Sequence, residues 1–447
     1  GLAEVARTKR VALCGIKPDQ TEADFSWKSL KPPDAVLLAS DLSLTNVSSV
    51  LTSLNLFDNQ TGVEGGKAIA AALRVNSVLT DLNMCHNSGI TGDAAQQLAA
   101  AVLGSASLEV FSEVPLKQLR ADALTELDLR GKGLGPAEGI VLAKLVGVSS
   151  VLTSIGEGGL DLRGNGIGDE GWGAIIAGAC ANPDSKISSI DASNKGIGPA
   201  GAKVIGEALR TSVNSVLTSL ELHDNRIGDE GAKAIGEALR VNSVLTDLNL
   251  ADNQLCGLDR RGRGVYTAEG INAIAEALRV NSVLTSLNIA TNNLIGETSY
   301  YIKASTVQGK SFNVGDKVTY QGREMIVSRG KDSHGDIKMK PLEWLSGIAA
   351  IADALRVNSV LTSLNLYDNQ IGVEGGKAIG AALHVNSVLT SLNLSENKLC
   401  GVDWRGDGAY TAEGINAIAN ALRVNSVLTK VLVFPASSDS SPWPSYH

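Results

Sequence analysis

Histidine and cysteine are the residue types best suited to metal binding or nucleophilic catalysis, and they are rare in this chain. The histidines are His86, His223, His334, His384 and His447, and the cysteines are Cys14, Cys85, Cys180, Cys256 and Cys400. None of them has a second His or Cys at the spacing of metal ligands, and no Ser, His and acid trio stands out. The sequence therefore predicts no metal, no cofactor and no catalytic centre.

Two glycine-rich segments, Gly62 to Lys67 and Gly372 to Lys377, both read GVEGGK and resemble a phosphate-binding loop. The glycine spacing of such a loop is absent, and alanine rather than serine or threonine follows each lysine. Both segments fall at the same place in a repeated unit, where a turn leads into a helix. We therefore interpret them as structural.

Composition excludes several classes of protein. The 447 residues carry a net charge of -8, which does not favour a general nucleic-acid binder. The five cysteines are odd in number and widely spaced, so they indicate no disulfide framework and we expect a reducing compartment. No segment has the length of a membrane span or the apolar centre of a secretory signal. Because the chain opens at Gly1, a targeting peptide could precede it, and the cytoplasm or an organelle interior is the expected location.

The candidate elements come from a repeat of 28 residues, whose most frequent words are NSVLT and SVLT. Eleven strands are expected to start at Leu51, Leu79, Leu124, Leu152, Ile187, Leu217, Leu245, Leu284, Leu361, Leu389 and Leu428. In the first unit, Leu54 and Leu56 alternate as in a strand, and Ala68, Ile69, Ala72 and Leu73 have helical spacing. Each unit is thus predicted to be a strand, a turn and a helix.

An asparagine closes most strand segments, and Lys132 and Lys195 take its place in two irregular repeats. The members of this ladder are Asn59, Asn87, Asn165, Asn225, Asn253, Asn292, Asn369 and Asn397. A carboxamide both donates and accepts, so stacked asparagines can satisfy backbone groups where the chain bends away from the sheet. We expect a structural role for them.

The pattern LxxLxLxxNxxGxxGxxxLxxxL at 28 residues resembles the ribonuclease-inhibitor-like class of leucine-rich repeats, over residues 49–434 apart from insertions. The resemblance implies an α/β fold, a right-handed solenoid or horseshoe with a concave parallel sheet and convex helices, and protein binding by the concave face. The wording of the units also resembles uncharacterised repeat proteins of algae and other protists. One family of GTPase-activating proteins shares the repeat type, so regulation of a small GTPase is an alternative.

The domain organisation follows from where the repeat breaks. Residues 1–48 are expected to be an N-terminal cap with a strand at Ala35–Ala39, and residues 49–296 and 346–434 to be repeats with a final cap. Residues 297–345 alternate as a small antiparallel sheet, and VGDKVTY gives this insert a resemblance to an SH3-like barrel. Its excess of basic residues makes nucleic-acid binding by the insert a further alternative. The tail at 435–447 is expected to be flexible.

Long loops interrupt two repeats, CGLDRRGRGVYTAEG from Cys256 and CGVDWRGDGAYTAEG from Cys400. Loops on one edge of a repeat array are natural binding elements. Arg260 and Arg263 become Trp404 and Asp407 in the second copy, so a shared phosphate-binding role is not expected.

Side chains on the outward face of the strands are free of the core and carry the functional prediction. The candidate partner-binding residues are Phe57, Asp128, Arg130, Asp161, Arg163, Asp191, Glu221, His223, Tyr367, Arg260 and Trp404. An acidic stripe beside two arginines could recognise a charged protein surface, with the aromatic residues as anchors. The alternative is that the stripe forms ion pairs within the sheet, for example Asp128 with Arg163. We expect a non-enzymatic protein-binding scaffold or a peripheral subunit of a larger assembly.

Overall fold

The computed structural model describes residues 12–44, 49–87, 89–295, 300–308, 312–313, 316–320, 323–331, 335–341, 345–402 and 410–433. Trp404 and the tail at 435–447 lie outside these ranges. The chain divides into two compact units, residues 1–217 and 218–447, and each is described by itself.

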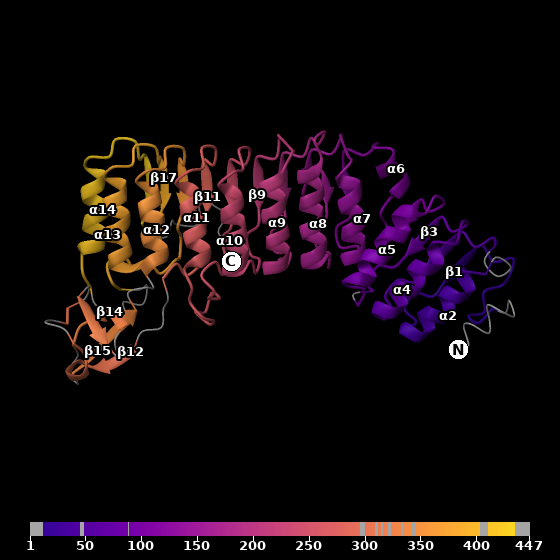
Figure 1. Cartoon of the computed structure of the whole chain (residues 1–447), viewed down its shortest axis with the longest axis horizontal. Helices are drawn as coiled ribbons and strands as arrows, with labels where there is room; N and C mark the ends of the chain where they lie inside the picture. The colour runs from indigo at the N-terminus through magenta and orange to yellow at the C-terminus, as the bar shows by residue number, and fades with distance from the viewer. Residues whose placement is uncertain are drawn as a thin grey trace. The chain divides into compact units, whose positions relative to one another are not determined.

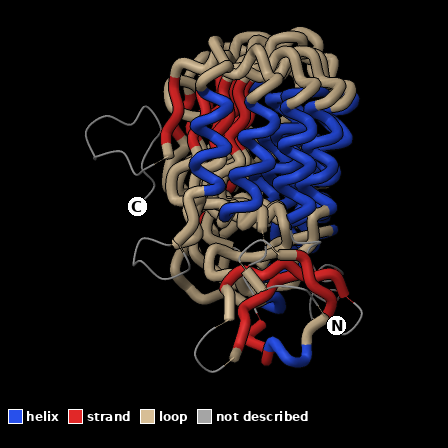
Figure 2. The backbone as a smooth tube through the Cα atoms, turned by 90° about the vertical axis from the view of Figure 1, so that its left-hand side faces the viewer, coloured by secondary structure: helices blue, strands red, loops and turns tan. Residues whose placement is uncertain are grey.

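Each regular repeat folds into one short strand and one helix (Figure 1). In the first repeat, β2 (Ser53–Asn55) leads into α4 (Gly62–Leu73), and β3 (Asp81–Asn83) follows. Leu54 and Leu56 from the strand segment and Ile69 and Leu73 from the helix are buried. The core therefore lies between a layer of strands and a layer of helices, which Figure 2 shows in red and blue. The predicted strand and helix periodicities are confirmed here.

The first unit has two parallel sheets. Its other elements are β1 (Glu22–Asp24), α2 (Pro32–Leu42), α5 (Asp93–Gly104), β4 (Val110–Phe111), α6 (Leu116–Arg120), β5 (Leu127–Asp128), α7 (Pro136–Val146), β6 (Ser154–Ile155), β7 (Leu160–Asp161), α8 (Gly168–Ala181), β8 (Ser189–Asp191) and α9 (Pro199–Thr211). One sheet has the order β1-β2-β3-β4, and the other runs β8-β6-β7-β5. Equivalent residues pair along neighbouring strands, as Leu54 does with Leu82.

The second unit repeats the same pattern more regularly. Its repeat elements are β9 (Ser219–Glu221), α10 (Gly228–Leu239), β10 (Asp247–Asn249), α11 (Glu269–Leu278), β11 (Ser286–Asn288), α12 (Ser346–Leu355), β16 (Ser363–Asn365), α13 (Gly372–Leu383), β17 (Ser391–Asn393), α14 (Glu413–Leu422) and β18 (Lys430–Leu432). The strands follow the order β9-β10-β11-β16-β17-β18. Leu248 pairs with Leu287, and Leu287 pairs with Leu364, so the insertions do not shift the register.

The predicted strand at Ala35–Ala39 is wrong, because this segment is the middle of α2. The helix begins with Pro32, which suits a first helical position because its missing N–H would have no partner there. The Asp34 carboxylate accepts a hydrogen bond from the backbone N–H of Lys31 at 2.9 Å. The strand that extends the sheet is β1, ten residues or so earlier in the chain.

The irregular part of the first unit contains strands that the repeat pattern did not predict. The long interval between the strand starts at Leu79 and Leu124 holds β4 and α6, which form a shortened repeat. The repeat that starts at Leu152 contains two strands, β6 and β7, which pair with each other. Leu160 pairs with both Leu127 and Ile155, so β7 lies between β5 and β6.

Buried asparagines join successive repeats. Asn253, Asn292 and Asn369 are each 0% exposed. Asn292 Oδ1 accepts the backbone N–H of Asn253 at 2.9 Å, and Asn369 Oδ1 accepts that of Asn292 at 2.8 Å. The Asn292 amide group donates to the carbonyl oxygen of Leu250 in the preceding repeat. The asparagines thus satisfy backbone groups that the sheet leaves unpaired, as predicted from the sequence.

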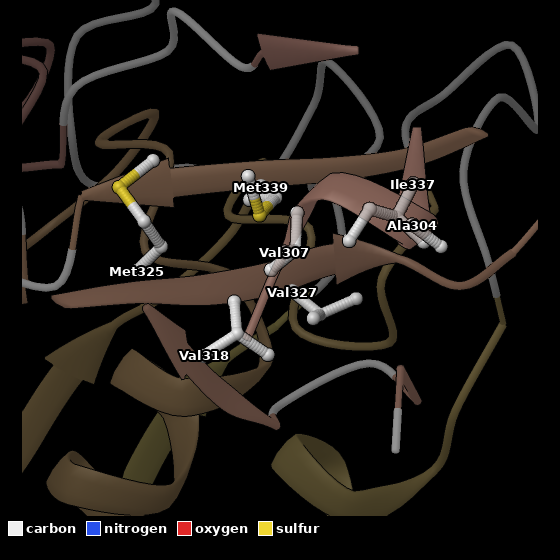
Figure 3. Close-up of a cluster of buried hydrophobic side chains, with 7 residues drawn as sticks. All are labelled: Ala304, Val307, Val318, Met325, Val327, Ile337 and Met339. Atoms are coloured by element: carbon white, nitrogen blue, oxygen red, sulfur yellow. The ribbon is translucent and has the colours of Figure 1, made fainter. Parts of the chain in front are cut away.

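The insert forms an antiparallel sheet of its own. Its strands are β12 (Tyr300–Lys303), β13 (Lys317–Tyr320), β14 (Arg323–Arg329) and β15 (Asp336–Pro341), in the order β12-β15-β14-β13. Val318, Met325, Val327, Ile337 and Met339 are buried together with Ala304 and Val307 (Figure 3). The insert therefore has a small apolar core separate from the leucines of the repeats. Its likeness to an SH3-like barrel stays a prediction.

Candidate functional site

The predicted charged stripe of the first unit is paired within the chain. Arg130 Nη2 lies 2.7 Å from Asp128 Oδ2, and Arg163 Nη2 lies 2.7 Å from Asp161 Oδ2. Arg130 Nε also lies 3.6 Å from Asp161 Oδ2 on the neighbouring strand. The expected pair of Asp128 with Arg163 is replaced by pairs between residues two apart in sequence, in which each arginine lies just beyond the strand that ends with its aspartate.

These contacts set the protonation of the stripe. The hydrogen bond from the Arg130 side chain lowers the pKa of Asp128 to about 2. The Arg163 side chain holds the pKa of Asp161 below its usual range, and only 5% of Asp161 is exposed. Both carboxylates are therefore ionised at neutral pH, and the positive charges of Arg130 and Arg163 balance their negative charges. Water therefore reaches Asp128 and the two arginines, whereas Asp161 is buried.

Asp191 continues the stripe on β8. Its carboxylate accepts the backbone N–H of Ser193 at 3.0 Å. The Lys195 ammonium lies 5.8 Å from the centroid of the Trp172 ring, and burial lowers the pKa of this lysine against the attraction of Asp191 and Asp161. Trp172 is 1% exposed. Lys195 therefore stands over the core at the edge of the stripe, at a place where regular repeats have the ladder asparagine.

In the second unit, Glu221 and His223 form a separate polar group with Asn249. The Asn249 amide donates to Glu221 Oε2 at 2.7 Å, and His223 Nδ1 lies 3.6 Å from the same oxygen. Asn249 and Ala251 are only 7% and 4% exposed, so little of either side chain is available to a partner. Asn249 pairs with Asn288, and Asn288 pairs with Asn365, on successive strands. The narrow spacing of parallel strands leaves little room for water between these side chains.

The other predicted residues of the second unit lie at the loops that follow the strands. Arg260, in the first long loop, forms an ion pair with Asp252. Burial raises the pKa of Asp252, and the nearby Asp224 adds to this while Arg260 opposes it. Tyr367 is 38% exposed. Arg260 thus anchors its loop to the repeat, whereas Tyr367 remains accessible. Trp404 lies outside the described residues.

Phe57 belongs to an aromatic cluster that the sequence analysis did not identify. Its ring centroid lies 5.3 Å from that of Trp27 and 4.9 Å from that of His86. We call Trp27, Phe57 and His86 the aromatic cluster. Trp27 is 68% exposed. Each of the three residues follows one of the first three strands, and this shared position was the signal in the sequence. The shared position of Trp27 could be recognised only once β1 was located.

Backbone contacts fix the aromatic cluster. The backbone N–H of Trp27 donates to the Phe57 carbonyl at 3.0 Å, and that of His86 donates to the Gly133 carbonyl at 2.9 Å. A Cβ atom at Gly133 would lie only 2.1 Å from the His86 ring, so the approach requires glycine. Trp27 has a φ of +58°, a conformation that costs a bulky residue on the order of 1 kcal/mol or more. The fold therefore holds this exposed indole in one place at some cost.

Carboxylates lie on strands of the sheet that leads into the aromatic cluster. Glu22 and Asp24 are exposed on β1, and Asp81 is half-buried on β3. Burial raises the pKa of Asp81, and the charge of Glu113 raises it further. Lys132 Nζ lies 3.6 Å from Glu113 Oε2. The first sheet thus presents aromatic rings in a mostly acidic setting.

The described residues contain no group of His, Cys, Asp and Glu arranged to hold a metal ion. Among the same residues, no helix has the length and apolar character needed to cross a membrane. The cysteines are apart from one another and unpaired.

The thiols are expected to react slowly in the folded protein. Burial raises the pKa of Cys14 to about 12, of Cys85 to about 12 and of Cys180 to about 11. Since the thiolate is the reactive form, alkylation of these residues at pH 8 should be on the order of 100-fold slower than that of a free thiol, or slower still. Mass spectrometry after timed labelling with iodoacetamide measures this. Guanidinium chloride should remove the protection, and rapid labelling of native Cys180 would contradict the prediction.

Comparison with known proteins finds similarity to leucine-rich repeats. The leucine-rich-repeat family model matches residues 47–70, 160–175, 213–236 and 357–380. No curated protein matches the chain in sequence. Among solved structures, the leucine-rich repeat-containing protein LegL7 from Legionella pneumophila is 15% identical, with 81% of this chain and 85% of that chain covered and a TM-score of 0.38. A chain of the yeast Rad7 and Elc1 complex is 12% identical, with 96% and 74% covered and a TM-score of 0.34. Leiomodin-1 actin-binding site 2 is 19% identical, with 48% and 88% covered and a TM-score of 0.30.

The family assignment rests on the repeats themselves. Each regular repeat has buried leucines in a short parallel strand, an asparagine that donates a hydrogen bond to the neighbouring repeat, and a helix that packs on the strand. The family model matches in both units of the chain. The chain is therefore a leucine-rich-repeat protein with the α/β solenoid fold of that family.

Proposed function

We propose that this protein is a non-enzymatic scaffold that binds a protein partner through the outward face of its strands, with the long loops at the edge of that face. Neighbouring strands pair with each other, so their backbone groups are mostly occupied and recognition falls to side chains. A preformed array loses little conformational entropy on binding, which favours this use. A peripheral place in a larger assembly is consistent with the same surface.

The aromatic cluster is the observation that carries the proposal. Exposed tryptophan held against a second ring is the chemistry of interface hot spots, because a rigid ring buries a large area with few rotatable bonds. The acidic residues around the cluster favour a partner with basic residues at its rim. The arginine and aspartate stripe of the first unit is largely neutralised in the chain, so it would contribute orientation more than affinity.

Replacing Trp27 with alanine is expected to weaken binding of the native partner roughly tenfold or more, the usual effect of losing a hot-spot tryptophan. The partner is first isolated with the intact protein from its native source and located by cross-linking. Affinities of the purified pair are then measured by isothermal titration calorimetry.

Val75→Ala is the matched control for that measurement, because Val75 is 65% exposed but follows α4, away from the strand face. Trp27→Phe should restore part of the affinity. Equal affinities for the Trp27→Ala and Val75→Ala variants, or cross-links confined to the helices, would remove the strand face as the binding surface.

A further inference from the structure

The two long repeats contain nearly the same sequence in different surroundings. Residues 266–278, YTAEGINAIAEAL, and residues 410–422, YTAEGINAIANAL, differ only at Glu276 and Asn420. The first segment leads into α11 and the second into α14. Because the other side chains are identical, a difference in their burial reports what lies next to them.

The first copy is covered by the repeat that follows it. Helix α11 packs against α12, and Ile271 and Leu278 are 0% and 1% exposed. The Tyr266 hydroxyl donates to the Leu294 carbonyl oxygen at 2.9 Å, and burial raises the pKa of this tyrosine. Gly347, in the first turn of α12, allows the close approach, since a Cβ there would lie 2.8 Å from Ile271. This side of the repeat is built to meet another repeat.

The second copy has the same side open. Tyr410 is 75% exposed and Leu422 is 38% exposed, whereas in the first copy Tyr266 is half-buried and Leu278 is 1% exposed. Ala419 is exposed and Ile415 is half-buried. Strand β18 pairs with β17 on one side, and within the described chain no strand pairs with its other edge. We call Tyr410, Ile415, Ala419, Leu422 and the free edge of β18 the terminal face.

The other end of the repeats is closed. The Asp41 carboxylate of α2 is 0% exposed and accepts hydrogen bonds from the backbone N–H groups of Leu13 and Cys14 at 2.9 and 2.7 Å. Ile16 is 3% exposed, so the segment before β1 covers the outer side of α2. A head-to-tail stack of chains would require an open face at this end. The two ends are therefore not complementary to each other.

We propose that the terminal face binds the terminal face of a second copy of this chain, giving a dimer with two-fold symmetry. The occupant follows from the first copy, where the cover for the same side chains is another repeat of the same kind. A second chain supplies such a repeat, and a two-fold axis places each apolar face against an identical one. Across that axis the two β18 edges run antiparallel, so their unpaired backbone groups can bond to each other.

The charges around the terminal face are compatible with self-pairing. In the first copy, Arg279 Nε lies 3.8 Å from a Glu276 carboxylate oxygen, whereas in the second copy Arg423 donates to the neutral Asn420 amide at 3.3 Å. Glu413 is paired with Lys377 of α13. Two-fold contact brings identical residues near one another, so the replacement of Glu276 by Asn420 removes a repulsion between carboxylates. The arginine charge is no longer balanced by a carboxylate, so the exposed Arg423 of each copy must stay in water at the rim of the contact. The centre of the face is apolar and uncharged.

Sedimentation equilibrium of the full chain tests the dimer. We expect a species of twice the 46.4 kDa chain mass at micromolar concentration, in a concentration-dependent equilibrium with the monomer. Leu422→Arg should raise the dissociation constant at least about tenfold, because it brings a charge into an apolar contact. Val385→Arg is the control, since Val385 is 55% exposed after α13 and outside the terminal face. Far-ultraviolet circular dichroism verifies that both variants fold.

A second measurement does not depend on weakening the contact. Ala419→Cys should form a covalent dimer on mild oxidation, because a residue near a two-fold axis meets its own copy, whereas Val385→Cys should not. A full chain that stays monomeric at tens of micromolar overturns the proposal. Open-ended polymers overturn the two-fold arrangement. A dimer that appears only after residues 434–447 are removed would also overturn it, because the chain itself would then occupy the face.

Discussion

Replacing Asn292 with alanine is expected to lower the free energy of unfolding of the second unit by roughly 3–5 kcal/mol, since each buried polar group left without a partner costs about 1–3 kcal/mol. Asn292 is 0% exposed and its amide donates to the carbonyl oxygens of Leu250, Ile289 and Ala290 at 2.9 to 3.1 Å. Its oxygen accepts the backbone N–H groups of Asn253 and Leu255. In the alanine variant all of these backbone groups lose their hydrogen-bond partner at a place where water has little access.

Asn288→Ala is the control for this variant. Asn288 is also buried, but its oxygen accepts one hydrogen bond, from the backbone N–H of Ala290 at 3.1 Å. Its loss should cost about 1 kcal/mol. Urea titrations followed by circular dichroism give both values, and hydrogen exchange should show the loss of protection concentrated at β10 and β11. Equal destabilisation by the two substitutions would contradict the ladder as the main link between repeats.

Sequence periodicity predicted the repeats because the same few letters perform the same local task each time. Leu245, Leu248 and Leu250 are buried as expected, and Asn253 links one repeat to the next. Such roles depend on the residue and its nearest equivalents in the neighbouring repeats. They can therefore be predicted from one chain.

The candidate site depends on contacts that the repeat does not encode. The aromatic cluster needed the position of β1, which has little apolar pattern, and Trp27 contacts Phe57 across a separation of thirty residues. The partners of the stripe depended on side-chain direction, because Arg130 and Arg163 bend back to the carboxylates two residues earlier in the chain. Charge signs alone did not distinguish these pairs from cross-strand ones.

Identical segments can also have different environments, which the sequence alone cannot show. Tyr266 and Tyr410 occupy the same position in the same sequence segment, yet Tyr266 donates a partly buried hydrogen bond and Tyr410 is 75% exposed. What differs is the next element in space. The terminal face therefore could not be recognised from its sequence, which is nearly the same as that of the covered first copy.

Replacing Glu138 with glutamine is expected to remove a pH-dependent loss of stability from the first unit. Glu138 is 4% exposed, and burial raises the pKa of its carboxyl group although Ser112 and Gly135 donate hydrogen bonds to it at 2.8 and 2.9 Å. The folded state thus keeps this proton to higher pH than the unfolded state does. By linkage, the stability from this group is full below the ordinary carboxyl pKa and is lost as the pH rises through the raised one.

Urea titrations across a pH series should show wild type and Glu138→Gln close together in acid, with the variant more stable at neutral pH. Glu109→Gln serves as the control, because Glu109 forms a surface ion pair with Lys117 and its loss should leave the wild-type pH profile of the first unit in place. Parallel profiles for wild type and Glu138→Gln would show that the buried carboxyl does not control the slope.

The hydrogen bond from Ser112 allows the same mechanism to be tested from the opposite side. This bond favours the ionised carboxylate and so lowers the pKa of Glu138, against the larger effect of burial. Ser112→Ala should therefore raise that pKa further and extend the loss of stability to higher pH. The backbone N–H of Met84, which donates to the Ser112 hydroxyl at 3.0 Å, also loses its partner. That second loss is independent of pH, so it lowers the whole profile, while the change in slope between acid and neutral pH reports Glu138.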